Sequence, residues 1–233
     1  MIDLYCLTSP NVQKVFLMLE ECELPYRQVK VDVWKGEQFS PEFLKVNPIG
    51  KVPAIVDHDG PGGKACTVFE SGAILMYLAE KTGKFLPKDP RARFDALQWM
   101  MFQMCNVGPM FGQYVHYKMF APPGNDYSVS RYTTQMRRCY EVLEKRLGEA
   151  PYMGGEDYGI ADIATFPWTR NREAWGVKDA DNPNIARWFK AIAERPAAKR
   201  MIDIVSKITS ERDKATDENK DRMFGRGRFA QVA

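Results

Sequence analysis

Two short segments of the chain combine a rigid backbone with groups that bind charge. Residues 47–56 read NPIGKVPAIV, a turn and then a proline that enters a short apolar strand. Residues 69–78 read FESGAILMYL, in which an acidic residue and a serine come directly before an apolar helix. An Asn-Pro dipeptide alone indicates only a turn. The two segments together predict a two-part pocket for a small peptide.

The dipeptide Val52-Pro53 suits recognition of a peptide backbone. If the bond before Pro53 is cis, the N–H and C=O of Val52 face outward as a strand edge, and a peptide ligand can form two main-chain hydrogen bonds with that edge. Lys51 beside the edge suits a ligand carboxylate, although an isolated lysine is more often a surface residue.

Glu70 and Ser71 place an anionic group beside the start of a helix. The hydroxyl and N–H of Ser71 can hold a carboxylate, while Glu70 can hold an ammonium group. An adjacent pair of sites for anion and cation suits the zwitterionic end of an amino acid. Taken alone, Ser71 is equally well explained as a helix N-cap.

A third candidate group, Ser9-Pro10-Asn11, lies where the first helix is expected to begin. An ordinary N-cap with proline at the first helical position explains the tripeptide alone. The same geometry stabilises an anion such as a thiolate, because a helix N-terminus offers unpaired N–H groups and the positive end of the dipole. Thr8, Ser9 and Asn11 would then donate hydrogen bonds to the sulfur, Asn11 without an acid–base role.

A small sheet is required to position these groups. Apolar and alternating stretches predict strands, and apolar residues at every third or fourth position predict helices. Their order over residues 1–83 is βαβ–ββα, that of an α/β thioredoxin-like domain whose first two strands are parallel. The expected elements are strands over 2–7, 26–33, 53–56 and 64–69, a helix from residue 12 that ends before Pro25, and a helix over 71–81.

The rest of the chain predicts an all-α helical-bundle domain over residues 91–205. One long apolar segment, 91–118, is expected to be kinked at Gly108-Pro109, and later helices are expected over 132–147, 160–168 and 185–192. Residues 206–233 contain 12 charged residues among 28 and lose the apolar period. We expect this charged tail to be extended or disordered.

Charge and composition restrict the classes of partner. The net charge of +3 gives no general case for nucleic-acid binding. Residues 1–80 carry −4 and the remainder +7, which fits two units and attraction of an anionic ligand, or simply solvated helix faces. No apolar stretch is long enough to cross a membrane, so we expect neither a membrane nor a nucleic-acid partner.

The cysteines indicate reduced thiols rather than a disulfide framework. Their number is odd, no CxxC occurs, and the two histidines offer no zinc-ligand spacing, so we expect no metal and a cytoplasmic location. We expect Cys6 to be a buried structural thiol. The five are Cys6, Cys22, Cys66, Cys105 and Cys139.

Over residues 1–205 the chain resembles the cytosolic glutathione transferase superfamily. The closest likeness is to the bacterial nu-class group, which is related to the disulfide-bond reductases and the yeast nitrogen-regulator-like proteins. The likeness lies in residues 1–5, 9–11, 35–43, 47–56, 69–80 and 160–164. One departure is Gly159, where the family usually has a Ser or Thr N-cap. We expect this glycine to lower the stability of the fold by about a few tenths of a kcal/mol.

The resemblance implies that glutathione, γ-Glu-Cys-Gly, is the cosubstrate. It implies Glu70 and Ser71 at the γ-glutamyl end, Val52 and Pro53 at the cysteinyl backbone, and Gln38 and Lys51 near the glycyl end. At the thiol it implies Ser9 and Asn11, with Thr8 as an alternative to Ser9. It also implies that Arg131 meets the carboxylate of a second glutathione.

The implied enzyme is a homodimer that stabilises the glutathione thiolate and most readily reduces disulfides. Neither Cys6 nor Cys22 occupies the first-turn position where cysteine-using transferases keep their nucleophile, so no protein thiol is expected as catalyst. The alternative activity is a lyase or ether-cleaving transferase acting on an aromatic electrophile, since residues 111–120 are rich in aromatic and soft side chains. His116 is either part of that acceptor pocket or an ordinary surface or core residue.

A non-catalytic binding or regulatory protein with the same fold is a further reading, because fold alone does not imply activity. The intact set of charge-binding and thiol-binding groups argues against it, since a pure scaffold has no physical reason to combine them. These groups are Ser9, Asn11, Val52, Glu70 and Ser71.

Overall fold

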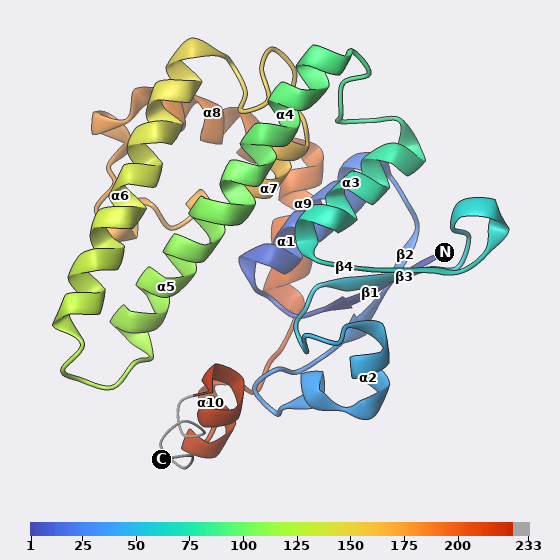
Figure 1. Ribbon diagram of the computed structural model, residues 1–233, viewed down its shortest axis with the longest axis vertical. Coiled ribbons are helices and arrows are strands. Elements are labelled where there is room, and N and C mark those ends of the chain that lie inside the picture. Colours follow the sequence, from blue (N-terminus) through green and yellow to red (C-terminus); the bar gives the residue numbers. More distant parts are fainter. Residues whose placement is uncertain (226–233) are drawn as a thin grey trace. The chain divides into compact units, whose positions relative to one another are not determined.

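Four short strands form one mixed sheet in the order β2-β1-β3-β4 (Figure 1). In the computed structural model, which describes residues 1–225, β1 is parallel to β2, whereas β3 is antiparallel to both β1 and β4. The predicted strands and their order along the chain are confirmed, with strand ends shifted by at most three residues. The strands are β1 (Ile2–Cys6), β2 (Tyr26–Lys30), β3 (Ala54–Asp57) and β4 (Cys66–Phe69).

Three helices accompany this sheet, and two of them were expected from the sequence. They are α1 (Pro10–Cys22), α2 (Pro41–Val46) and α3 (Ser71–Thr82). Helix α2 is the addition, and it begins with its own serine cap and proline. The result is a thioredoxin-like arrangement.

The sequence specifies both ends of α1. Ser9 has an extended backbone and its hydroxyl oxygen accepts a hydrogen bond from the N–H of Val12, while Pro10 occupies the first helical position. Glu23 ends the helix in the left-handed region, with φ of 56°. Between these ends most side chains are buried, so α1 forms the centre of its unit's core.

The chain divides into two compact units. One joins Met1–Ile74 with the residues from Arg200 onward, and the other spans Leu75–Lys199. The division falls inside α3 and inside α9 (Pro196–Lys207), whereas the predicted domain boundaries at 83 and 205 follow helix ends and remain a prediction.

The predicted long segment 91–118 consists of two helices joined by a π-helical turn, Gln103–Val107. Helix α4 (Pro90–Phe102) precedes the turn and α5 (Gly108–Met119) follows it. Pro109 has no N–H to donate to the carbonyl four residues earlier, which accounts for a wider turn just before it. The sequence predicts a kink at Gly108-Pro109, and the structure has a π-helical turn that ends directly before this dipeptide.

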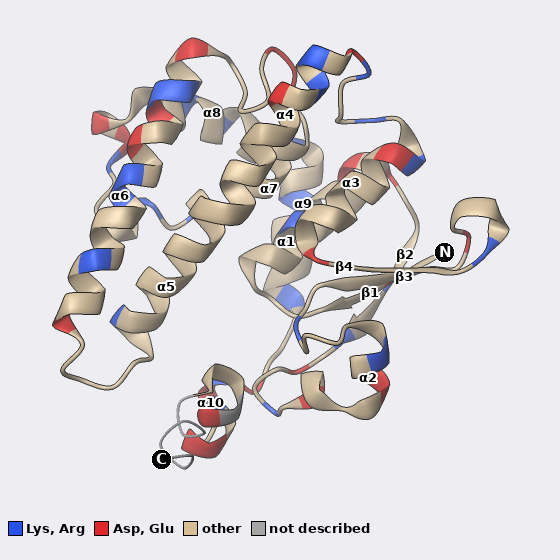
Figure 2. Ribbon diagram, in the orientation of Figure 1, with Lys and Arg blue, Asp and Glu red and all other residues tan. Residues whose placement is uncertain are grey.

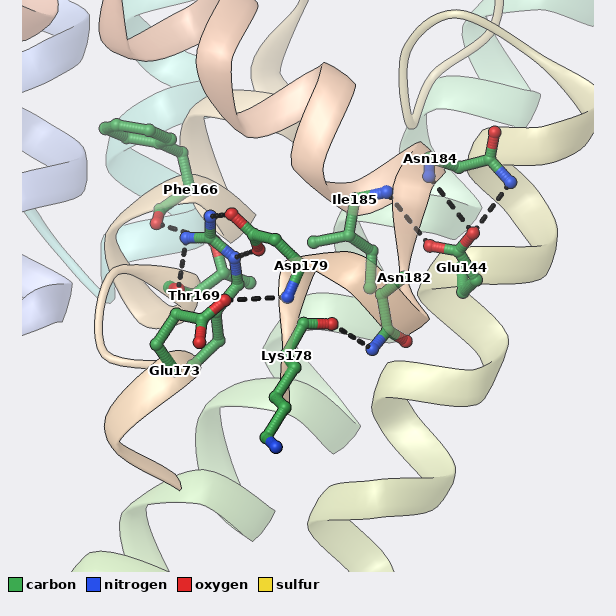
Figure 3. Close-up of polar contacts among 10 residues, drawn as sticks. Glu144, Phe166, Thr169, Glu173, Lys178, Asp179, Asn182, Asn184 and Ile185 are labelled. Carbon is green, nitrogen blue, oxygen red and sulfur yellow. Dashed lines mark hydrogen bonds and ion pairs between the residues drawn. The ribbon is translucent and has the colours of Figure 1, made fainter. Parts of the chain in front are cut away.

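Three further helices confirm the predicted all-α character of the second unit. They are α6 (Asp126–Glu149), α7 (Ile160–Thr169), which is buried along its whole length, and α8 (Pro183–Ala193). Glu144 of α6 accepts hydrogen bonds from the backbone N–H groups of Asn184 and Ile185 at the start of α8 (Figure 3). A carboxylate from one helix therefore satisfies the first N–H groups of another.

The start of α7 explains the glycine at position 159. The buried carboxylate of Asp162 accepts hydrogen bonds from the N–H groups of Met153 (2.8 Å) and Gly159 (3.0 Å) and from the indole of Trp188 (2.7 Å). A Cβ at Gly159 would lie 2.8 Å from the carbonyl oxygen of Phe85. Glycine is thus required here by a close backbone contact, and comparing cap propensities alone misses this reason.

The predicted extended tail is wrong for part of the described chain. Residues Asp217–Phe224 form α10, which closes against Trp34 within the first unit. The side-chain amide of Asn219 donates to the carbonyl of Trp34, and the Trp34 and Phe224 rings meet edge-on at 6.1 Å between centroids. These contacts order a segment whose composition indicated disorder. Residues 226–233 lie outside the described residues.

The contact at Gly159 generates a stability prediction. Cap propensity alone would make Gly159→Ser neutral or slightly stabilising. Because the new Cβ would meet a backbone carbonyl at 2.8 Å, we expect a loss of about 1–3 kcal/mol in the free energy of unfolding instead. Gly112→Ser is the control, since its Cβ would make an ordinary 3.6 Å contact with Trp168. Urea denaturation of both variants measures this, and an unchanged or raised stability in Gly159→Ser would contradict it.

Candidate functional site

One end of the sheet gathers the three candidate segments. Tyr5 of β1 lies opposite Ala54 of β3, and Ala54 lies opposite Phe69 of β4. The carboxyl end of β1, the amino end of β3 and the carboxyl end of β4 therefore coincide. The residues that leave or enter the sheet at this end are Thr8–Asn11, Val52-Pro53 and Glu70-Ser71.

The amino end of α1 carries the predicted thiol-binding residues. The Ser9 oxygen caps the helix, so the ordinary N-cap reading is confirmed, and the hydroxyl hydrogen remains a donor. The side-chain amide of Gln13 donates to the carbonyl of Thr8 at 2.8 Å and holds the turn. Asn11, at the second helical position, is half-buried. This end of α1 therefore offers an anion the positive end of the helix dipole and several hydrogen-bond donors.

Asn47 holds the turn that leads into Val52-Pro53. Its buried side-chain amide donates to the carbonyl of Lys51 at 2.6 Å, and its oxygen accepts from the N–H of Ile49 at 3.2 Å. The Val52–Pro53 peptide bond is cis. Lys51 itself is exposed, which is compatible both with binding a ligand carboxylate and with being an ordinary surface residue.

Gln38 is buried beside the same turn. It lies in the 3-10 turn Glu37–Phe39. The backbone carbonyl oxygen of Gln38 and the ring of Phe39 would both lie within 3.2 Å of a Cβ at Gly50. Gly50 has φ of 65°, so glycine suits both its backbone and its close neighbours. Among the described residues the Gln38 Oε1 has no hydrogen-bond partner. A buried acceptor of this kind calls for a donor from a ligand or water.

Glu70 and Ser71 differ sharply in burial. Glu70 is exposed and adopts a left-handed backbone, with φ of 68°. Ser71 is the first residue of α3 and is buried. Its Oγ lies 3.3 Å from the Nζ of Lys14 on α1. The contact links the starts of two helices that both point toward the shared end of the sheet.

Lys14 is the site residue that the sequence analysis missed. Its side chain is 1% exposed, and burial lowers its pKa to about 7, against which the Glu70 carboxylate acts to raise it. The available signal was a lysine inside the stretch 12–19, whose other members are apolar except Gln13. A cation on the buried face of a helix is rare unless it is paired.

The cysteines fit a structural role better than a catalytic one. Cys6 is 1% exposed and burial raises the pKa of its thiol to about 12. Burial likewise raises the pKa of Cys139 to about 11. Cys22 is buried, whereas Cys105 is exposed on the π-helical turn of the second unit. Since the thiolate is the nucleophile, Cys6 is unsuited to attack at neutral pH.

In the second unit the predicted acceptor residues are only partly available. Phe111 and Tyr114 are buried and both meet Trp175, while Met119 is exposed. His116 is half-buried, with its ring edge-on to a neighbouring tyrosine, so its predicted alternatives stay open. Arg131 lies exposed near the start of α6.

Residues 1–225 contain neither a metal-binding cluster nor a membrane-spanning helix. No group of three or more histidine, cysteine, aspartate or glutamate residues in that range is arranged to hold a metal ion. No helix in the same range has the length and apolar character needed to span a membrane.

The fold and site define a class of protein: a thioredoxin-like unit with polar helix starts at one end of its sheet, combined with an all-α unit. Family profiles support this class. Residues 8–81 match the glutathione S-transferase N-terminal domain, and residues 107–196 match the glutathione S-transferase C-terminal domain.

Individual relatives match most of the chain. It is 48% identical over 203 residues to "Disulfide-bond oxidoreductase YfcG" of Escherichia coli, covering 87% of this chain and 94% of the relative. "Disulfide-bond oxidoreductase YghU" of the same organism is 38% identical, covering 85% and 73%. The chain therefore belongs to the glutathione transferase family and is an enzyme of that family.

Solved structures agree with this assignment. A glutathione transferase from Burkholderia graminis, with two glutathione molecules bound per subunit, has a TM-score of 0.82 and 44% identity, covering 87% of each chain. One from Pseudomonas putida, with one glutathione disulfide bound per subunit, has a TM-score of 0.82 and 42% identity, covering 87% of this chain and 91% of that one.

Proposed function

We propose that this protein is a glutathione-dependent disulfide reductase. The observation that carries the proposal is the convergence of three groups at one end of the sheet: the amino end of α1, the Val52 backbone and the Glu70-Ser71 pair. The names of the two Escherichia coli relatives support the reaction type, and the ligands of the related structures support the cosubstrate.

Glutathione binds in this proposal as an extended peptide. Glu70 takes the ammonium group and Ser71 the α-carboxylate of the γ-glutamyl end, and Val52 forms main-chain hydrogen bonds with the cysteinyl residue beside Pro53. Gln38 and Lys51 serve the glycyl end. The buried Oε1 of Gln38 supports that role, because an N–H of the ligand would satisfy it.

The reaction is two successive thiol–disulfide exchanges. Thr8, Ser9, Asn11 and the α1 dipole lower the pKa of the glutathione thiol by stabilising its thiolate. The thiolate attacks one sulfur of the substrate disulfide, forming a mixed disulfide and releasing the other sulfur as a thiolate that takes up a proton. A second glutathione thiolate attacks the glutathione sulfur of the mixed disulfide. This step forms oxidised glutathione and releases the remaining substrate sulfur as a thiolate that takes up a proton, so two electrons pass to the substrate.

Asn11→Ala tests whether glutathione supplies the reacting sulfur. We expect kcat for disulfide reduction to fall at least about tenfold, since a hydrogen bond to the charged thiolate is lost. Cys6→Ala and Cys22→Ala should retain activity, and Asn171→Ala, an exposed asparagine of the second unit, is the matched control. Steady-state assays with a small disulfide give the result. A dead cysteine variant beside an active Asn11→Ala would make the mechanism a protein-thiol one.

Arg131 is proposed to bind the carboxylate of the second glutathione. Its planar guanidinium pairs with a carboxylate by two parallel hydrogen bonds. We expect Arg131→Ala to lower the affinity for oxidised glutathione more than the affinity for reduced glutathione, as measured by calorimetry. Arg137→Ala, another exposed arginine on α6, is the control. Equal losses for both ligands, or none, would reject this site and favour the lyase or ether-cleaving alternative.

We also propose a cytoplasmic homodimer. No Lys, Arg, Asp or Glu occurs in residues 96–117, and Figure 2 shows the corresponding stretch of α4 and α5 free of both colours of charge. Phe94 is 73% exposed and Met101 44% exposed on α4. Exposed apolar side chains on α4, within and just before this uncharged stretch, favour a two-fold contact with a second copy.

Light scattering of the full chain checks the dimer. We expect about 53 kDa, twice the chain mass of 26.7 kDa. Phe94→Glu should shift the species toward the monomer at micromolar concentration, because it places a charge in the contact. Tyr127→Glu is the control, as Tyr127 is 79% exposed on α6. A mass near 27 kDa for the unmodified protein would refute the dimer.

A further inference from the structure

The buried cation Lys14 has no part in the reaction as described so far. Its Nζ lies 3.3 Å from the Oγ of Ser71, and both side chains are almost fully buried. An ammonium group carries three donors and no acceptor. In this contact the charged form of Lys14 therefore donates and the hydroxyl oxygen of Ser71 accepts.

That direction determines how the Ser71 hydroxyl meets a ligand. Its oxygen faces Lys14, so its own hydrogen is directed away from Lys14. A carboxylate only accepts hydrogen bonds, and Ser71 can meet it only as a donor. The lysine therefore sets the hydroxyl in the orientation that a carboxylate requires and places a positive charge behind it.

The charges around Lys14 point to the same ligand group. A buried cation is costly unless an anion compensates it. Glu70 is a carboxylate that acts on Lys14, and in the proposed site the exposed Glu70 also holds the ligand ammonium. Glu70 would then face two cations, Lys14 and the ligand ammonium group. A ligand carboxylate at Ser71 would supply the second anion, so that two negative charges meet two positive ones.

We propose that Lys14 is a positioning residue that makes the Ser71 corner selective for the α-carboxylate of the γ-glutamyl group. This inference rests on the proposed glutathione site and deepens it, because it assigns carboxylate recognition to a residue beneath the pocket. Lys14 acts through Ser71 and through its charge, and it takes no part in thiol chemistry.

Two variants of Lys14 separate its charge from its hydrogen bond. Lys14→Met removes both and keeps a buried chain of similar length, and replacing a buried charge by an apolar side chain is often well tolerated. Lys14→Gln removes the charge and keeps an N–H donor. Both are compared with Ser71→Ala, Glu70→Ala and the unmodified full chain.

Three ligands report on the two ends of the zwitterion by calorimetry. They are reduced glutathione, its glutaryl-Cys-Gly analogue, which lacks the ammonium group, and its 4-aminobutanoyl-Cys-Gly analogue, which lacks the α-carboxylate. We expect Lys14→Met to lower the affinity for glutathione and for the glutaryl analogue about tenfold, and the affinity for the 4-aminobutanoyl analogue less than twofold. Ser71→Ala should follow the same pattern and Glu70→Ala the opposite one. Lys14→Gln should fall between Lys14→Met and the unmodified chain.

Kinetics supply a second readout. KM for glutathione should rise in Lys14→Met while kcat at saturating glutathione stays within about twofold. Val15→Ala, which creates a cavity beside Lys14 in the buried part of α1, is the control for structural damage. It should lower stability without distinguishing the three ligands.

The outcomes separate the inference from the proposed function. If the unmodified chain fails to bind glutathione, both are overturned. If the chain binds glutathione and Ser71→Ala shows the carboxylate-specific loss but Lys14→Met does not, the inference alone is overturned. An equal loss of all three ligands in Lys14→Met and Lys14→Gln would make Lys14 a structural residue and would also overturn it.

Discussion

The antiparallel pairing of β3 with both of its neighbours is the constraint on which the site depends. Ala54 lies opposite Tyr5 on one side and Phe69 on the other, so the segments flanking these residues meet at one end of the sheet. A slip by one residue would turn the buried face of β3 outward. The hydrophobic side chains of Leu4 and Ile55, both fully buried, therefore fix the register and with it the site.

Two helix starts at this end give the site its electrostatic character. The amino end of α1 follows β1 after three residues and that of α3 follows β4 after one residue. Each offers N–H groups and the positive end of a dipole. One suits a thiolate and the other a carboxylate, which is the charge pattern of ionised glutathione. Lys14 ties the two helices together through Ser71, so in the proposed site packing and ligand recognition would use the same contact.

The sequence predicts most of the fold because its elements carry local signals. Ser9 and Pro10 mark the start of α1, and the alternating residues after Pro25 mark β2. Features that depend on contacts distant in sequence were missed. Lys14 stands out within its apolar stretch, but its partner Ser71 lies 57 positions later and is known only from the structure. Likewise Gly159 needs the position of Phe85, and α10 needs Trp34.

The energetic cost of Lys14 argues that its charge is retained for function. A methionine of similar size would fill the same space between α1 and α3 without any desolvation penalty. Burial already lowers the pKa of Lys14 to about 7, so folding alone does not favour the charged form strongly. A bound carboxylate would favour the charged form. In the proposed site this carboxylate would act in the same direction as Glu70, which already raises the pKa of Lys14, and this agrees with a role of Lys14 in recognition.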